Sequence, residues 1–528
     1  MTINSLAFLI FFMVLTILYY LPFVKKYQWV LLLAASYIFY TLAGNHNLIY
    51  IIITTIVTYI GAILLDRKNT IQEEYVKAHK GILPKQEIKD YKEKIKKEKH
   101  KITFFCVFIN LGMLIVIKYG SFLMGNVGRI FGKENLSDIS FLQIAVPLGI
   151  SYYTLISIGY LLDVSKGKCK SEKNLFKTAL FVSYFPQITQ GPFSRFTEMA
   201  PRLFTSHKFS YENLSYGCQR ILWGFFKKMV IADRMKPMVD AIFENYQECS
   251  GFSLLLGCMY FSIQLYADFS GYMDIVCGCS NILGIELAEN FKRPFFSKSL
   301  AEYWRRWHIT LCSWFRDYLF YPLSISKAAV KFGRIGKKIL PPSIAKLVPS
   351  IFALSIIWLS TGLWHDASWR YVFWGIYNGV IIIASMCLEP WFIKIEKKLN
   401  IKAENKLFQG FQMIRTFLII SLLKVFPIAN STKGSLVILY KIFFEFQMEL
   451  SRAACFPTFK TEDFFCVGIG LLIFIYVSFK QEKAPMHESI NRCPFVVRWA
   501  IYLVLLLMIL TFGVFDTGLT GGFEYAQY

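Results

Sequence analysis

The stretch AEYWRRWHITLCSWFRDYLFYPL, residues 301–323, sets charged side chains among tryptophans and tyrosines inside an otherwise strongly apolar chain. Its charged members are Glu302, Arg305, Arg306, Arg316 and Asp317. A charge at the centre of a lipid-facing span costs about 2.5–3.5 kcal/mol on insertion scales, so a segment with this many charges does not face lipid. We expect it to lie at the membrane interface or to line a wet cavity within protein.

The spacing within this stretch predicts one helical face that carries a titratable group. The residues that share this face at 3.6 per turn are Trp304, His308, Cys312 and Phe315. Glu302 lies one turn before Arg306 and is placed to pair with it. His308 titrates near neutral pH when unperturbed.

Composition excludes a soluble enzyme of this size, because the 528 residues are 55% hydrophobic and 17% aromatic. The net charge of +23 comes from 58 Lys and Arg against 35 acids, much of it in loops between apolar segments. That placement is typical of the positive-inside rule and not of a nucleic-acid-binding surface. The sequence therefore predicts an all-α polytopic bundle in the cell membrane, with roughly ten or more spans.

Several apolar windows are candidates for these spans. They cover residues 5–24, 29–43, 48–65, 102–124, 141–162, 251–285, 347–364, 369–388, 407–428, 464–479 and 497–515. Residues 66–101 carry twelve Lys and Arg against seven acids, so this loop should be cytoplasmic. Counting spans from it places the N-terminus outside, and the basic start of the last span places the C-terminus outside as well.

Three further features predict a polar interior. Residues 175–234 have short apolar runs broken by prolines and basic residues, which favours re-entrant or in-plane helices around a central cavity. Asp268 and Asp274 interrupt an apolar window and should face inward. Residues 347–388 form a helical hairpin with His365 and Asp366 at its apex. We interpret residues 1–528 as one integral-membrane domain, with N-terminal spans in 1–140, a core in 141–390 and C-terminal spans in 391–528.

Two of the seven histidines, His308 and His365, lie in aromatic, near-membrane surroundings. A histidine is the natural general base near neutral pH, although each of these could instead be a hydrogen-bonded packing residue. Neither belongs to a recognisable metal motif, and the twelve cysteines lack zinc spacing, so we expect no metal site and reduced cysteines. The chain also lacks a phosphate-binding P-loop and a G-x-S-x-G elbow.

Several motifs together resemble one family. They are WRRWH at 304–308, GLWH at 362–365, GISYYTLISIGYLLDV from Gly149, FPQITQGPFSRF from Phe185, YADFSGYMDIVCG from Tyr266 and ENFKRPF from Glu289. The chain resembles the membrane-bound O-acyltransferase (MBOAT) family, in its bacterial alginate O-acetyltransferase branch. The related D-alanyl transfer protein of teichoic acid synthesis shares the ENF and WH patterns. Asp366 stands where that family usually has glycine, and Asn378 where a histidine is common.

The resemblance implies an acyl relay across the membrane with no bound cofactor. The donor would be a cytoplasmic thioester, either acetyl-CoA or an acyl carrier, which the basic cytoplasmic loops would attract. The acceptor would be an extracytoplasmic polysaccharide, reached directly or through an SGNH or esterase-like partner protein.

The same resemblance assigns roles to residues. His365 would be the general base, and His308 would orient the donor or stabilise its developing oxyanion. Trp304 would line the cavity, or else anchor a helix at the headgroups. Arg305 and Arg306 would keep the cavity positive.

Asn290 and Asp268 would position hydrogen-bond donors, or else serve as buried helix-pairing groups. Asp366 would orient or acidify the site. Two other functions stay open: D-alanyl transfer from a carrier protein toward teichoic acid, and a lipid or polysaccharide flippase that performs no covalent chemistry.

Overall fold

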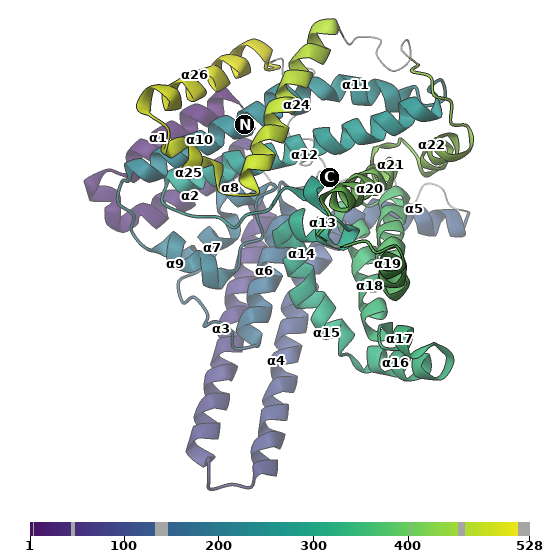
Figure 1. The fold of residues 1–528 in the computed structure, drawn as a ribbon. Coiled ribbons are helices and arrows are strands. Elements are labelled where there is room, and N and C mark those ends of the chain that lie inside the picture. The colour runs from purple at the N-terminus through teal and green to yellow at the C-terminus, as the bar shows by residue number, and fades with distance from the viewer. Residues whose placement is uncertain (4, 44–47, 133–145, 403, 452–459, 516–528) are drawn as a thin grey trace. The chain divides into compact units, whose positions relative to one another are not determined.

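The computed structural model describes residues 1–3, 5–43, 48–132, 146–402, 404–451 and 460–515. These residues form helices and connecting segments with no β-strand (Figure 1), which confirms the all-α prediction. Contacts divide the chain into two compact units, residues 1–217 with 279–288, and residues 218–278 with 289–528. The assignment of one domain to the whole chain stays a prediction.

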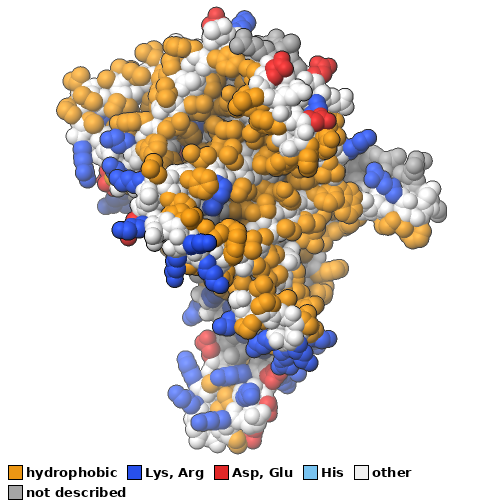
Figure 2. Space-filling model, turned by 45° about the vertical axis from the view of Figure 1, so that its right-hand side comes forward, with side chains coloured by type: hydrophobic (Ala, Val, Ile, Leu, Met, Phe, Trp, Pro, Cys, Tyr) orange, Lys and Arg blue, Asp and Glu red, His pale blue; other side chains and the backbone are white. Residues whose placement is uncertain are grey.

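Within the described residues, eight helical segments are long and apolar enough to cross a membrane. They are α3 (Leu48–His79), α4 with α5 (Lys85–Leu114 and Gly120–Ile130), α12 (Gly251–Ile282), α18 (Val348–His365), α19 (Trp369–Lys398), α20 with α21 (Lys406–Leu423 and Val425–Ile428), α24 (Thr461–Gln481) and α26 (Phe495–Phe512). Figure 2 shows hydrophobic side chains over much of the face in view, with basic side chains gathered in its lower part. The chain is therefore a multi-pass membrane protein.

The N-terminal apolar windows form a bent pair of helices, not two separate spans. α1 (Leu6–Tyr19) has 14 residues and rises about 21 Å, which is less than the hydrocarbon thickness of roughly 30 Å. Pro22 then starts a short 3-10 turn that leads into α2 (Gln28–Ala43). The two halves meet at 98° and supply a ninth span if they are counted as one. The helix within the predicted span over residues 5–24 ends at Tyr19, shortly before Pro22.

The basic segment 66–101 is a helical hairpin and not an irregular loop. α3 continues to His79, α4 begins at Lys85, and the two helices run side by side (Figure 1). Stacked rings of Tyr75 and Tyr91, 3.6 Å apart, and a 2.6 Å ion pair between Lys68 and Glu98 join them. Aromatic and charged pairs thus hold a polar extension of two helices whose other ends are apolar.

The centre of the first unit is α6 (Ile150–Ser165), which is buried on almost every face. Its N-cap Gly149 has φ +68°, and a Cβ there would lie 1.9 Å from the carbonyl oxygen of Ile188. Only glycine fits this position. The predicted span over residues 141–162 is only partly tested, because residues 141–145 lie outside the described part. The helix that does form is a core helix packed within protein.

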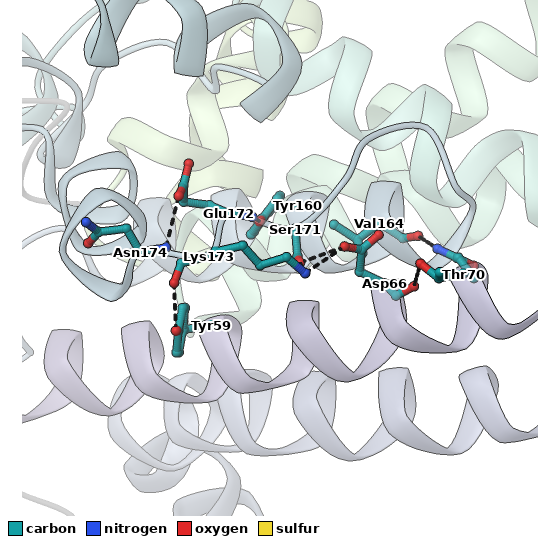
Figure 3. Close-up of polar contacts among 10 residues, drawn as sticks. Tyr59, Asp66, Thr70, Tyr160, Val164, Ser171, Glu172, Lys173 and Asn174 are labelled. Atoms are coloured by element: carbon teal, nitrogen blue, oxygen red, sulfur yellow. Dashed lines mark hydrogen bonds and ion pairs between the residues drawn. The ribbon is translucent and has the colours of Figure 1, made fainter.

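A short segment after α6 is fastened to α3 (Figure 3). Asp66 of α3 accepts hydrogen bonds from Ser171 Oγ at 2.9 Å and from Lys173 Nζ at 3.1 Å. Tyr59 donates to the Lys173 carbonyl at 2.9 Å, and Tyr160 of α6 accepts from the Glu172 backbone at 2.8 Å. This segment is therefore fixed by specific contacts to both helices.

The region predicted to be irregular is built from short helices. They are α7 (Leu175–Ser183), α8 (Phe185–Ile188), α9 (Phe196–Phe204), α10 (Tyr211–Phe225) and α11 (Asp233–Glu244). A π-helical turn at Phe226–Ala232 joins α10 to α11. The broken character is confirmed. The re-entrant or in-plane placement of these helices stays a prediction.

The remaining described helices belong to the second unit. They are α13 (Leu300–Arg306), α14 (Ile309–Phe315), α15 (Tyr321–Ser324), α16 (Lys327–Ile339), α17 (Pro342–Ala345), α22 (Thr432–Phe444) and α25 (Met486–Asn491). The predicted hairpin over residues 347–388 is confirmed as α18 and α19, which lie side by side (Figure 1). Their backbones meet at Gly362 and Gly375, where a Cβ would lie 2.3 Å from a carbonyl oxygen of the other helix.

A buried group of charges joins α12 to the turn after α10. Lys228 Nζ lies 2.7 Å from an oxygen of Asp233 and 2.7 Å from one of Asp268. Lys227 Nζ lies 2.6 Å from Asp274, whose other oxygen accepts from Arg220 at 2.9 Å. Each acid of α12 is therefore held by a cation from residues 220–228, as a low-dielectric interior requires.

Candidate active site

The stretch of residues 301–323 is not one continuous helix, because the helix is interrupted at His308. α13 ends at Arg306, His308 has a left-handed backbone with φ +45°, and α14 starts at Ile309. The break is stable because its backbone groups pair elsewhere. The Ile309 N–H donates to the carbonyl of Asn290, and the Lys292 N–H donates to the carbonyl of Arg306, both at 2.9 Å. The predicted continuous face through Trp304 and Cys312 is wrong for this reason.

Asn290 fixes the orientation and the tautomer of His308. Its Oδ1 accepts from the backbone N–H of Thr310 at 3.1 Å and from the hydroxyl of Thr310 at 2.8 Å. His308 Nδ1 lies 3.1 Å from the same oxygen. Because a backbone N–H can only donate, Oδ1 is the acceptor, and His308 Nδ1 carries the proton in the neutral ring. The basic lone pair is therefore on Nε2.

His308 is fully enclosed, with 1% of its surface exposed, and lies outside the candidate spans. Burial, with a further contribution from the positive charge of a protonated His365, holds the pKa of His308 well below its usual value. The ring therefore stays neutral at neutral pH, which suits a hydrogen-bonding role better than proton storage.

The two candidate histidines lie on either side of one tryptophan. The ring of Trp364 is 6.2 Å from that of His308 and 4.8 Å from that of His365, in edge-on contacts. His365 is the last residue of α18 and also packs edge-on against Trp374 of α19. The fold thus brings together His308, from the break between α13 and α14, and His365, from the end of α18.

His365 borders a small cavity that measures about 40 Å³ as the space open to the centres of water molecules. That is enough to hold at least one water molecule. The walls are formed by Phe261, Leu265, Tyr303, Trp304, Trp307, His365, Tyr371, Trp374, Asn378, Ile420, Leu423, Lys424 and Pro427. All of them belong to the second unit. Most of these residues are aromatic or aliphatic, and a few carry polar atoms.

Trp304 and Asp366, both predicted as site residues, differ in their position relative to the cavity. Trp304 lines the cavity and packs edge-on against Trp358. Asp366 caps α18 and is half-buried, but is not part of the cavity wall. Asn378, noted in the sequence only as a departure from the family pattern, is fully buried and does line the cavity.

The two predicted arginines do not line the cavity. Arg305 is exposed. Arg306 pairs with Glu302, as predicted, at 3.0 Å and with Glu482 at 2.9 Å. With two carboxylate partners Arg306 adds little net potential, and the positive cavity stays a prediction.

Asp268 is also absent from the cavity wall, because its carboxylate is engaged by Lys228 in the buried charge group. The helix-pairing interpretation therefore fits this residue. Asn290 differs, since it is 2% exposed and holds His308 directly.

Sequence reasoning missed Lys424, Tyr303 and Trp307 in this site. Lys424 lies in the break between α20 and α21, and its Nζ sits 4.6 Å from the centre of the Trp307 ring. In the sequence it shares the apolar window 407–428 with Arg415 and stands close to that window's end, where it resembles a flanking charge. Its burial, with 7% exposed, is the signal that only the structure supplies.

Metal-binding chemistry has no support in the described part of the chain, where no group of three His, Cys, Asp or Glu residues is arranged to hold an ion. The cysteines of that part are all free thiols.

Fold and site together define a multi-pass α-helical membrane protein with a buried histidine pair beside an aromatic cavity. Residues 171–334 match the family model of MBOAT, the membrane-bound O-acyltransferase family. This confirms the resemblance. The matched range contains His308, whereas His365 lies beyond it.

Curated relatives include the probable alginate O-acetylase AlgI of Azotobacter vinelandii, 31% identical over 60% of this chain and 57% of the relative. The peptidoglycan O-acetyltransferase of Helicobacter pylori is 29% identical over 52% of this chain and 53% of the relative. The teichoic acid D-alanyltransferase of Bacillus subtilis is 30% identical over 46% of this chain and 60% of the relative. The chain thus spans little more than half the length of the relatives it matches.

Proposed function

We propose that this protein is a membrane-bound O-acyltransferase that relays an acetyl group from a cytoplasmic thioester for O-acetylation of a cell-envelope polysaccharide. The observation that carries the proposal is the convergence of His308 and His365 on Trp364 in a buried, aromatic site. The family match over residues 171–334 and the relatives named as O-acetylating enzymes support it.

In this proposal His365 is the general base and His308 a supporting group. His308 is held neutral with its proton on Nδ1, so it can bind or orient through Nε2 but is a weak base. His365 takes the proton from the acceptor hydroxyl as that oxygen attacks the thioester carbonyl carbon. The new C–O bond forms, the C–S bond breaks, and His365 returns the proton to the departing sulfur.

The cavity beside His365 favours acetyl over D-alanyl. A D-alanyl group carries an ammonium, which an acetyl group lacks. The charged residue among the described cavity walls is Lys424, with no carboxylate beside it, so an ammonium there would meet like charge. D-alanyl transfer therefore ranks second.

The proposed setting is the cell membrane, with both termini outside and with His365 reached by the acceptor from the outer side. α18 has 18 residues and rises about 27 Å, close to the full hydrocarbon thickness. Single cysteines at Ser360 and Ser368, in a background without native cysteines, test this arrangement. Labelling of both by an impermeant reagent from the cytoplasm alone would reverse the proposed topology.

The donor and the partner are part of the same proposal. The donor would be acetyl-CoA or an acyl carrier, drawn by the exposed basic residues of α16. An SGNH or esterase-like protein would complete delivery where the polysaccharide is not the direct acceptor.

The deciding experiment is mass spectrometry of envelope glycans from cells with and without the gene, complemented by wild type or by His365→Ala. We expect O-acetyl groups to disappear on deletion and to return only with wild type. Loss of D-alanyl esters instead would favour the second function. Unchanged acylation together with altered export of a lipid or glycan would favour a flippase.

A further inference from the structure

Lys424 is a buried lysine without a hydrogen-bond acceptor among the described residues. Its side chain is 7% exposed, its Nζ has no hydrogen-bond partner there, and it lines the cavity that His365 borders. Nζ lies over the face of the Trp307 ring, 4.6 Å from the ring centre. A cation over an aromatic face gains some energy, but this does not replace the hydrogen bonds lost on burial.

Two other residues that line the same cavity carry donors in the same condition. The hydroxyl of Tyr303 and the indole Nε1–H of Trp304 are buried, and neither has a hydrogen-bond partner in the part of the chain that the structure describes. Both belong to α13, whereas Lys424 lies after α20. Buried donors in native proteins are nearly always satisfied, so three of them around one small space indicate that an acceptor atom occupies it.

The lining of the space restricts that acceptor. Aromatic walls disfavour a fully charged ligand but suit a small group with one polar oxygen. A carbonyl oxygen that becomes negative during reaction meets these conditions, because donors arranged around it stabilise the developing charge.

We propose that Lys424, with Tyr303 and Trp304, binds the carbonyl oxygen of the acyl group and stabilises the oxyanion formed when the acceptor attacks. This inference rests on the proposed acyl transfer and names the residues that hold its substrate. As the C–O bond forms, the carbonyl electron pair moves to the oxygen beside Lys424. It returns when the C–S bond breaks, and Lys424 neither gains nor loses a proton over the cycle.

The test compares two inert probes that share the pantetheine arm of CoA and of acyl carriers. S-acetonyl-pantetheine keeps a carbonyl oxygen, and S-propyl-pantetheine has the same carbon chain without it. Purified wild-type protein should bind the acetonyl probe roughly tenfold or more tightly, as expected for a hydrogen bond from a charged donor. Lys424→Met should remove that preference and leave the affinity for the propyl probe unchanged.

Thermal unfolding shows whether Lys424 is merely structural. Removing a buried ammonium that lacks an acceptor should leave the melting temperature of Lys424→Met unchanged or raise it. The control is Lys433→Met on α22, an exposed lysine whose loss should change neither stability nor probe preference.

Three results would overturn the inference: equal binding of both probes by wild type, binding of neither, or a preference that survives in a folded Lys424→Met. If that variant does not fold, Tyr303→Phe and Trp304→Phe provide the same comparison, and an undiminished preference in both counts against the site. The proposed function is tested separately, because glycan acetylation in gene-deleted cells does not depend on these probes.

Discussion

Asn290 Oδ1 and His308 Nδ1 lie 3.1 Å apart, and the same oxygen accepts the backbone N–H of Thr310. One amide thus holds the strained backbone at the helix break and sets the side chain that projects from it. Asn290→Leu should reduce acetylation roughly 10²-fold through misplacement of the ring.

The matched variant is Asn290→Asp, which keeps an acceptor oxygen but adds negative charge beside the imidazole. A nearby anion favours the protonated ring, so this variant should keep more activity and show a shifted pH–rate profile. Equal loss in both variants with no change in the profile would make Asn290 a packing residue only.

His365→Ala should abolish O-acetylation at unchanged protein abundance, since loss of a general base costs roughly 10²–10⁴-fold in rate. His308→Ala should lose activity to the same or a smaller extent, depending on how much donor orientation contributes. Glycan acetylation measured at matched membrane expression checks both. Retained acetylation in His365→Ala would eliminate the mechanism, and loss of the protein itself would indicate a packing role.

Stability should fall in mild acid because of His308. Its pKa in the folded protein is depressed by burial and by the charge of a protonated His365, whereas an unfolded histidine titrates near 6.5. Below about pH 6.5 the unfolded chain therefore binds a proton that the folded chain does not, and folding loses about 1.4 kcal/mol per pH unit until the depressed pKa is reached.

Melting temperatures in detergent at pH 7.5 and 5.5 check this expectation. Wild type should lose more stability between the two than His308→Asn, which lacks the titrating ring. Parallel losses in the two proteins would show that other groups dominate.

The basic side chains of α16 should speed donor capture without supporting the fold. Lys327, Lys331, Lys337 and Lys338 are exposed, while the helix packs through Gly333 and other small residues. Changing the four lysines to glutamine should lower the rate at low donor concentration, and added salt should remove the difference. Lys433→Gln is the control. A defect that persists at high salt would mean that the lysines are structural.

Local pattern predicted much of this fold. The α18–α19 hairpin, the broken region from α7 to α11 and the pair of His308 and His365 all follow from hydropathy, proline placement and the resemblance. The bend after α1 was missed, because a window average does not register one proline.

Two features of the site could not be predicted without the tertiary structure. The left-handed backbone of His308 is stable only because residues 290–292 pair with the break, a contact that helical periodicity cannot anticipate. Lys424 acquires its role from Trp307 and Tyr303, which lie far from it in sequence. The sequence also did not reveal that Arg306 pairs with Glu482, because Glu482 comes from a distant segment.

The buried charge group has a consequence for how the chain is made. Arg220, Lys227 and Lys228 leave the ribosome before α12, which carries Asp268 and Asp274. Each acid entering lipid alone adds roughly 2.5–3.5 kcal/mol to the cost of insertion, whereas cations already at the translocon would offset it. We expect nascent α12 to integrate poorly as an isolated segment and efficiently behind residues 211–250, so that biogenesis of this protein depends on the order in which its charges are synthesised.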